Sequence, residues 1–127
     1  MLNVVIAGCS GRMGHALLEA VKQSSDLHLH AALDRADSPL IGSDAGGLLG
    51  APCGVKISSD FISALQGAQV LVDFTRPEAS MQYIAACREY GVALVLGTTG
   101  FSAEQKTAIE SAARDVPIVF APNMSVG

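Results

Sequence analysis

The N-terminal stretch from Val4 to Gly14 limits the fold more than any other part of the sequence. An apolar run is followed by glycines at positions 8, 11 and 14, and a helical pattern of apolar residues begins at once. Such a run is typical of a strand buried on both faces. The sequence therefore predicts a strand over 2–7, a tight turn, and a helix over 12–23. Unpaired amides and the helix dipole favour an anion at the start of such a helix, so the expected ligand is the pyrophosphate of a dinucleotide.

The spacing of the three glycines predicts a separate role for each. Gly8 lets the chain turn sharply at the strand end, Gly11 lets a phosphate approach the backbone, and Gly14 lets helix and strand pack closely. The amides of Gly11 and Met13 are expected to face the ligand. Ser10 stands where the common fingerprint has its second glycine. A glycine-rich turn without any ligand is the alternative reading.

A second strand is predicted over 27–33, and it ends at Asp34 and Arg35. Asp34 lies twenty residues beyond Gly14, where a carboxylate is placed to accept hydrogen bonds from the adenosine ribose. A 2′-phosphate would be repelled by Asp34, and the guanidinium of Arg35 is able to compensate. The pair therefore suggests that the site tolerates both NAD and NADP. The alternative is an ordinary ion pair on the surface.

The rest of the chain alternates strands and helices. Residues 36–54 are predicted to form a long loop with one short helical turn. Further strands are expected over 55–58, 70–74, 93–96 and 118–120, and helices over 60–66, from Pro77 to Gly91, and from Ser102 to about Arg114. Thr75 is expected to cap the second of these helices, and Ser102 forms a capping box with Gln105.

This alternation predicts an α/β fold, a doubly wound parallel sheet with right-handed crossovers, as in Rossmann-like dinucleotide-binding domains. In such sheets ligands bind beyond the carboxyl ends of the strands. The polar and glycine-rich segments of this chain all follow predicted strands, so they are expected to meet at one rim.

Composition and charge exclude several classes of protein. Half of the residues are apolar, the formal charge is −4, and there is no long apolar run, signal peptide or basic cluster. We expect a soluble, cytoplasmic protein that binds neither membrane nor nucleic acid. Cys9, Cys53 and Cys87 are expected to be reduced thiols. Cys9, at a helix N-terminus, is a candidate for a mildly acidic thiol with a redox role, or else a small residue that fills the turn. His28 and His30 are expected to face solvent, and no metal site is predicted.

Five segments together resemble the N-terminal domain of the dihydrodipicolinate reductase family. They are Gly8-Cys9-Ser10-Gly11-Arg12-Met13-Gly14, Gly42-Ser43-Asp44-Ala45-Gly46, Asp73-Phe74-Thr75-Arg76-Pro77-Glu78, Gly97-Thr98-Thr99-Gly100-Phe101 and Ala121-Pro122-Asn123-Met124-Ser125-Val126-Gly127. The resemblance implies an oxidoreductase of lysine and diaminopimelate biosynthesis. Its nicotinamide cofactor, NADH or NADPH, reduces the product of dihydrodipicolinate synthase to tetrahydrodipicolinate.

The resemblance also implies which residues bind the cofactor. The pyrophosphate is assigned to Gly8, Cys9, Ser10, Gly11, Arg12 and Met13, the adenosine ribose to Asp34, and the 2′-phosphate of NADP to Arg35. The nicotinamide side is assigned to Gly97, Thr98, Thr99, Ala121, Pro122, Asn123 and Met124. Phe74 and Arg76 are further candidates, although Arg76 is equally suited to solvating a helix start. Two departures from the family are Asp34, often Glu, and Met124, often an aromatic residue.

The family places substrate-binding and acid-donating residues in a second domain that this sequence lacks. We therefore expect residues 1–127 to be an NAD(P)-binding domain that binds cofactor but does not turn over substrate alone. No catalytic residue is predicted in it. The family forms homotetramers largely through the missing domain, so a monomer is expected here. A stand-alone NAD(P)-binding sensory module is the alternative, and another dehydrogenase family with a similar first domain is a third hypothesis.

Overall fold

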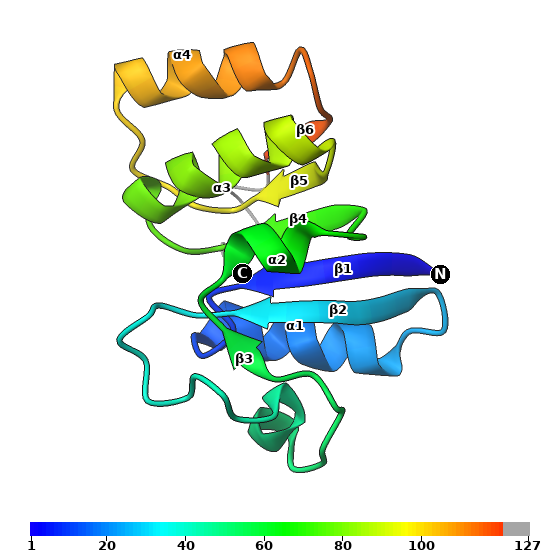
Figure 1. Ribbon diagram of the computed structural model, residues 1–127. Helices are drawn as coiled ribbons and strands as arrows, with labels where there is room; N and C mark the ends of the chain where they lie inside the picture. The colour runs from blue at the N-terminus through cyan, green and yellow to red at the C-terminus, as the bar shows by residue number, and fades with distance from the viewer. Residues whose placement is uncertain (121–127) are drawn as a thin grey trace.

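Six parallel strands form one sheet in the order β3-β2-β1-β4-β5-β6 (Figure 1). The computed structural model describes residues 1–120. The strands are β1 (Leu2–Ala7), β2 (Leu27–Leu33), β3 (Ile57–Ser58), β4 (Val70–Asp73), β5 (Ala93–Leu96) and β6 (Ile118–Phe120). The chain builds outward from β1 to β3 and then from β4 to β6 on the other side. The predicted doubly wound sheet is confirmed, with its switch point between β1 and β4.

Each face of the sheet has its own apolar core. Alternate residues of β1 point to opposite faces, so Val5 belongs to one core and Ile6 to the other. The first core is covered by α2 (Phe61–Leu65), α3 (Pro77–Tyr90) and α4 (Ala103–Ala112), and the second by α1 (Arg12–Gln23) and the 3₁₀ helix η1 (Ala45–Leu49). Burial on both faces explains why the central strands read as continuous apolar runs.

The helix ends show which capping predictions hold. Ser102 and Gln105 form the predicted capping box at α4, with both reciprocal bonds present. Gly91 ends α3 in the left-handed conformation, with φ of 71°. The prediction for Thr75 was wrong, because Arg76 occupies the N-cap position of α3 without a side-chain cap. The Thr75 hydroxyl instead donates to a buried carboxylate, described below.

The long loop between β2 and β3 is held by Asp44. Its carboxylate accepts amide hydrogen bonds from Gly46 (2.7 Å), Cys53 (2.9 Å) and Gly54 (2.8 Å). These bonds lower the pKa of Asp44 to about 2. One side chain thus ties both ends of the η1 segment together. No described helix is long and apolar enough to span a membrane.

Candidate dinucleotide-binding site

The ends of the central strands are level, so the segments that follow them meet at one rim. Ala7 pairs with both Leu33 and Asp73, and Asp73 pairs with Leu96. In Figure 1 the arrowheads of β1, β2 and β5 all point to the left, toward this rim. The glycine turn and the segments after β2, β4 and β5 therefore lie together, as the topology predicts.

The glycine turn leaves several amides open at the start of α1. Gly8 adopts a positive φ of 78°, and its amide donates to the carbonyl of Leu33. The Gly11 amide donates to the Gly8 carbonyl at 3.1 Å, so the expectation that it faces a ligand was wrong. The amides without an acceptor among the described residues include those of Ser10, Arg12 and Met13. Open donors at a helix N-terminus form an anion site.

Close packing explains the glycine at position 14 but not the one at position 11. A Cβ on Gly14 would lie 2.1 Å from the carbonyl oxygen of Gly8, so α1 packs directly against the turn. Gly11 has an ordinary φ of −77°, and a Cβ there would come no closer than 3.5 Å to that same oxygen. The protein itself therefore has no need of glycine at position 11. A close approach of an external group to this exposed backbone is a reason for glycine there.

Asp34 directly follows β2 and has one carboxylate oxygen without a hydrogen-bond partner among the described residues. Asp34 is 7% exposed, and its backbone amide donates to the carbonyl of Ser58 at 3.0 Å. The Oδ2 atom is buried and has no hydrogen-bond partner among the described residues. Buried polar atoms are nearly always paired, so an acceptor left open at the rim indicates a missing donor.

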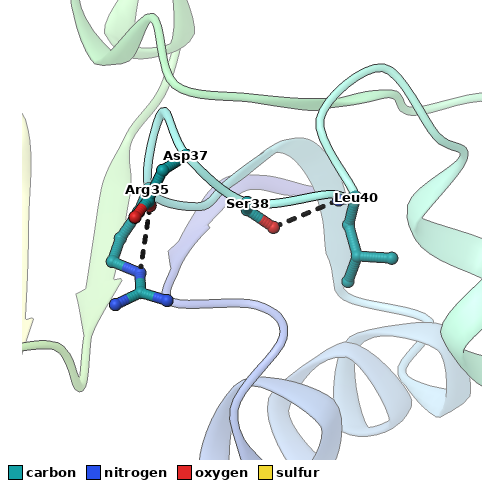
Figure 2. Close-up of polar contacts among 4 residues, drawn as sticks. All are labelled: Arg35, Asp37, Ser38 and Leu40. Atoms are coloured by element: carbon teal, nitrogen blue, oxygen red, sulfur yellow. Dashed lines mark hydrogen bonds and ion pairs between the residues drawn. The ribbon is translucent and has the colours of Figure 1, made fainter.

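Arg35 follows Asp34 but does not pair with it. The guanidinium is exposed, and its Nε lies 3.5 Å from Oδ1 of Asp37 (Figure 2). The surface ion pair that was the alternative for Arg35 therefore exists, but with Asp37 as the partner. The side chain of Asp34 stays buried beside it.

A buried carboxylate that the sequence analysis did not single out lies at the end of β4. Asp73 is fully buried, and its Oδ1 accepts from the Thr75 amide at 2.9 Å and from the Thr75 hydroxyl at 2.6 Å. Ser80 donates to Thr98 at 2.8 Å, and the Thr98 hydroxyl lies 3.5 Å from the same Oδ1. The signal that was available was an acidic residue within the buried run 70–74.

The segment after β5 packs against the segment after β4. The Gly97 amide donates to the Asp73 carbonyl at 2.8 Å, and a Cβ on Gly97 would lie 2.0 Å from the ring of Phe74. The Thr98 hydroxyl points into the buried network, whereas Thr99 is exposed. Of the two threonines predicted for this side, Thr99 is therefore the accessible one.

A comparison with known protein families decides the relationship. A family model described as "Dihydrodipicolinate reductase, N-terminus" matches residues 2–124. The chain belongs to the dihydrodipicolinate reductase family. The matched part is the nucleotide-binding domain of a pyridine-nucleotide-dependent reductase, consistent with NADH or NADPH as the cofactor.

Individual relatives of this dihydrodipicolinate reductase domain agree. It is 55% identical over 127 residues to 4-hydroxy-tetrahydrodipicolinate reductase of Nitrosomonas eutropha, covering 100% of this chain and 47% of that protein. The identity to the Chromobacterium violaceum enzyme of the same name is 57% over 125 residues, covering 98% of this chain and 47% of the relative. The chain thus spans about half the length of the curated relatives it matches.

Solved structures place the fold in the same family and beyond it. A dipicolinate-bound dihydrodipicolinate reductase from Paenisporosarcina sp. TG-14 superposes with a TM-score of 0.79 at 26% identity, covering 99% of this chain and 49% of that one. Homoserine dehydrogenase of S. aureus superposes with a TM-score of 0.73 at 13% identity, covering 94% and 32%. That second likeness shows only that the fold is shared.

Two other expectations for this reductase domain, on Cys9 and on the histidines of β2, have definite outcomes. Cys9 is fully buried, and burial raises the pKa of its thiol to about 11, so the mildly acidic thiol was wrong. His28 is exposed as expected, but His30 is half-buried, with Nε2 2.6 Å from the carbonyl oxygen of Gln66. Within residues 1–120 no cluster of three or more His, Cys, Asp or Glu side chains is arranged to hold a metal ion. The predicted contacts Ala121, Pro122, Asn123 and Met124 lie outside the described residues.

A cavity of about 390 Å³ lies away from the rim. It is bounded by the C-terminal half of α1, the start of β2 and the η1 segment, with Leu18, Leu29 and Leu49 among its lining residues. The open amides and Asp34 are at the other end of the strands, so we do not assign this cavity to the cofactor.

Proposed function

We propose that this chain binds NADH or NADPH at the strand-end rim and supplies the cofactor-binding half of a 4-hydroxy-tetrahydrodipicolinate reductase. In lysine and diaminopimelate biosynthesis that enzyme forms tetrahydrodipicolinate. The observation that supports this most directly is that two features occur at the same rim. One is the set of open amides at the start of α1, and the other is the buried Asp34 carboxylate oxygen without a hydrogen-bond partner among the described residues. An anion site beside an open carboxylate acceptor fits a pyrophosphate joined to a ribose.

The pyrophosphate is assigned to the glycine turn. The amides of Ser10, Arg12 and Met13 are its donors, and Gly11 leaves room for its oxygens at the backbone. Gly8 and Cys9 shape the turn without presenting side chains, because Cys9 is buried. The Asp34 carboxylate is assigned to the ribose hydroxyls as their acceptor, and Arg35 is assigned to a 2′-phosphate.

The nicotinamide side is assigned to the segment after β5 and to residues 121–124. Gly97 and Thr99 border the rim there. The buried Thr98 hydroxyl accepts a hydrogen bond from Ser80 of α3, which anchors the segment to that helix. The bound nicotinamide supplies a hydride. The work of this chain's residues is to hold the ring at the rim in one orientation, which favours transfer by positioning.

The substrate half of the reaction is assigned to residues outside this chain. The relatives are about twice as long, and reduction of an imine-like carbon needs a proton donor and a clamp for substrate carboxylates. We therefore propose that the isolated chain binds cofactor, is monomeric and cytoplasmic, and has no reductase activity alone.

Calorimetric titration of the 127-residue chain with NADH and with NADPH tests the proposal. We expect binding with a Kd on the order of micromolar. Absence of heat with both dinucleotides at concentrations near a millimolar would contradict it. Binding without any reductase activity in a protein containing the family's second half would instead favour the sensory-module alternative.

A further inference from the structure

We propose that Asp37 is a specificity-determining residue that disfavours NADPH relative to NADH by pairing with Arg35. The inference rests on the proposed function, since it concerns the same adenosine end of the site. Asp37 lies three residues beyond Asp34 and is not among the residues that the family resemblance assigns to the cofactor. Its effect is exerted on the guanidinium that would otherwise be free to meet a 2′-phosphate.

The geometry puts the two side chains on one short turn. The Ser38 amide donates to the Arg35 carbonyl at 2.9 Å, which closes the chain over residues 35–38. Figure 2 shows the Arg35 and Asp37 side chains on one side of this turn, with Nε of Arg35 3.5 Å from Oδ1 of Asp37. The pairing therefore follows from the local backbone and not from a chance approach of distant segments.

The turn is also anchored on its far side. The Ser38 hydroxyl accepts a hydrogen bond from the Leu40 amide at 3.2 Å, and the Leu40 side chain packs against the apolar core between α1 and the sheet. Figure 2 shows this second contact beside the ion pair. The backbone of Asp37 is thus held close to Arg35 by contacts on both sides of the turn, whereas 77% of its side chain is exposed to solvent.

The charges around Arg35 oppose a phosphate. Asp34 and Asp37 flank Arg35 in the sequence, so residues 34–37 carry two carboxylates against one guanidinium and a formal net charge of −1. A 2′-phosphate must displace or share the Asp37 contact and also approach that carboxylate. NADH presents only a hydroxyl there, so its affinity depends little on Asp37.

The size of the effect follows from the exposure of the pair. Exposed ion pairs are weak and are screened by salt, so we expect a shift in preference of about three- to five-fold. In Asp37→Asn the ratio of Kd for NADPH to Kd for NADH falls by that factor at low ionic strength. At about 1 M salt, where the Debye length is only about 3 Å, most of the shift disappears.

The experiment is a titration of the 127-residue chain with NADPH and NADH at both salt concentrations. Asp37→Asn and Asp37→Ala are compared with Glu110→Gln, which removes the same charge from the exposed surface of α4. Both Asp37 variants are expected to shift the ratio, and Glu110→Gln is expected to leave it unchanged. An unchanged ratio in the Asp37 variants, or an equal shift in Glu110→Gln, overturns the inference while dinucleotide binding itself still stands. If neither dinucleotide binds the unaltered chain, the proposed function fails, and this inference fails with it.

Discussion

The hydroxyl of Thr75 donates a 2.6 Å hydrogen bond to Oδ1 of Asp73, a carboxylate that is fully buried. The same oxygen accepts from the Thr75 amide, so the chain leaving β4 is tied back to the strand end before α3 begins. The other carboxylate oxygen, Oδ2, is buried without a partner among residues 1–120. One carboxylate oxygen of Asp73 therefore has good hydrogen bonds, and the other has none among these residues.

Asp73→Asn is expected to change the pH dependence of stability. Burial raises the pKa of Asp73 above its ordinary value of 3.8, and hydrogen bonds offset only part of that. Because the pKa of Asp73 is raised in the folded state, protonation of its carboxyl group stabilises the folded protein. This stabilisation is fully present below pH 3.8 and is lost as the pH rises through the folded-state pKa. The wild type loses about 1.4 kcal/mol for each pH unit between the unfolded and folded values, whereas the amide variant does not titrate.

Urea unfolding of both proteins measures this difference in pH dependence. The series starts at about pH 3.5, close to the ordinary carboxyl pKa, and continues upward. The free energy of unfolding of Asp73→Asn minus that of the wild type should be constant at the acid end and should increase as pH rises. Comparing two proteins at each pH cancels the other carboxylates. A difference that does not vary with pH would show that Asp73 titrates normally in the folded state.

The sheet was predictable because its central strands are apolar on both faces and end in glycine or polar residues. The actual role of the Thr75 hydroxyl was not predictable, because capping rules consider only the residues at the local helix start. A buried carboxylate two residues earlier competes for the same hydroxyl, and that competition depends on Asp73 being covered by α3 and the neighbouring strand. The available sign was an acidic residue in an otherwise apolar run.

Gly14→Ala is expected to destabilise the fold strongly. The added Cβ would lie 2.1 Å from the Gly8 carbonyl oxygen and 2.6 Å from Cα of Cys9, both backbone atoms that cannot move away cheaply. We expect a loss of about 3 kcal/mol or more in the free energy of unfolding. Gly47→Ala is the matched control, because a Cβ at that position meets nothing within 4 Å. Its effect should stay within about 0.5 kcal/mol, and equal losses in the two variants would count against the close packing of α1 on the turn.

The candidate site was predictable in its location but not in its atomic detail. Topology alone brings the strand ends to one rim. Which amides stay open depends on the turn, where Gly11 uses its amide for the Gly8 carbonyl. The partner of Arg35 depends on the 35–38 turn, and the residues of that segment do not by themselves specify which side chains the turn brings together. The thiol of Cys9 was misjudged because its position suggested an exposed helix start, whereas the residue is fully buried.

Arg35→Ala is expected to weaken NADPH binding by about 1–3 kcal/mol, the size of a lost charge-assisted contact, with little effect on NADH. Calorimetry with the two dinucleotides measures both values. Arg88→Ala is a suitable control, because it removes an equal charge from α3, where the guanidinium pairs with Asp115. Equal losses for NADPH and NADH in Arg35→Ala would show that the 2′-phosphate assignment is wrong.

Asp44→Asn is expected to loosen the loop between β2 and β3. An amide nitrogen would face some of the backbone donors that the carboxylate now accepts, so hydrogen exchange at Gly46, Cys53 and Gly54 should accelerate. The hydrogen bonds lower the pKa of Asp44 from 3.8 to about 2. Its contribution to stability is therefore fully present above pH 3.8 and is lost progressively as pH falls from 3.8 through the folded-state value of about 2. The difference in urea midpoint between variant and wild type should therefore shrink below pH 3.8. A difference that persists undiminished at about pH 2 would argue against the hydrogen-bonded carboxylate as its cause.

Gly97→Ala tests whether the segments after β4 and β5 are packed against each other. A Cβ on Gly97 would lie 2.0 Å from a ring carbon of Phe74, but a half-buried side chain can yield more readily than backbone. We expect a loss of about 1–3 kcal/mol in the free energy of unfolding for the single variant. In the background of Phe74→Ala the same change should cost less, because the ring is gone. Urea unfolding of the four proteins gives a coupling energy, expected to be about 1–2 kcal/mol, and simple additivity would mean that the ring moves aside without cost.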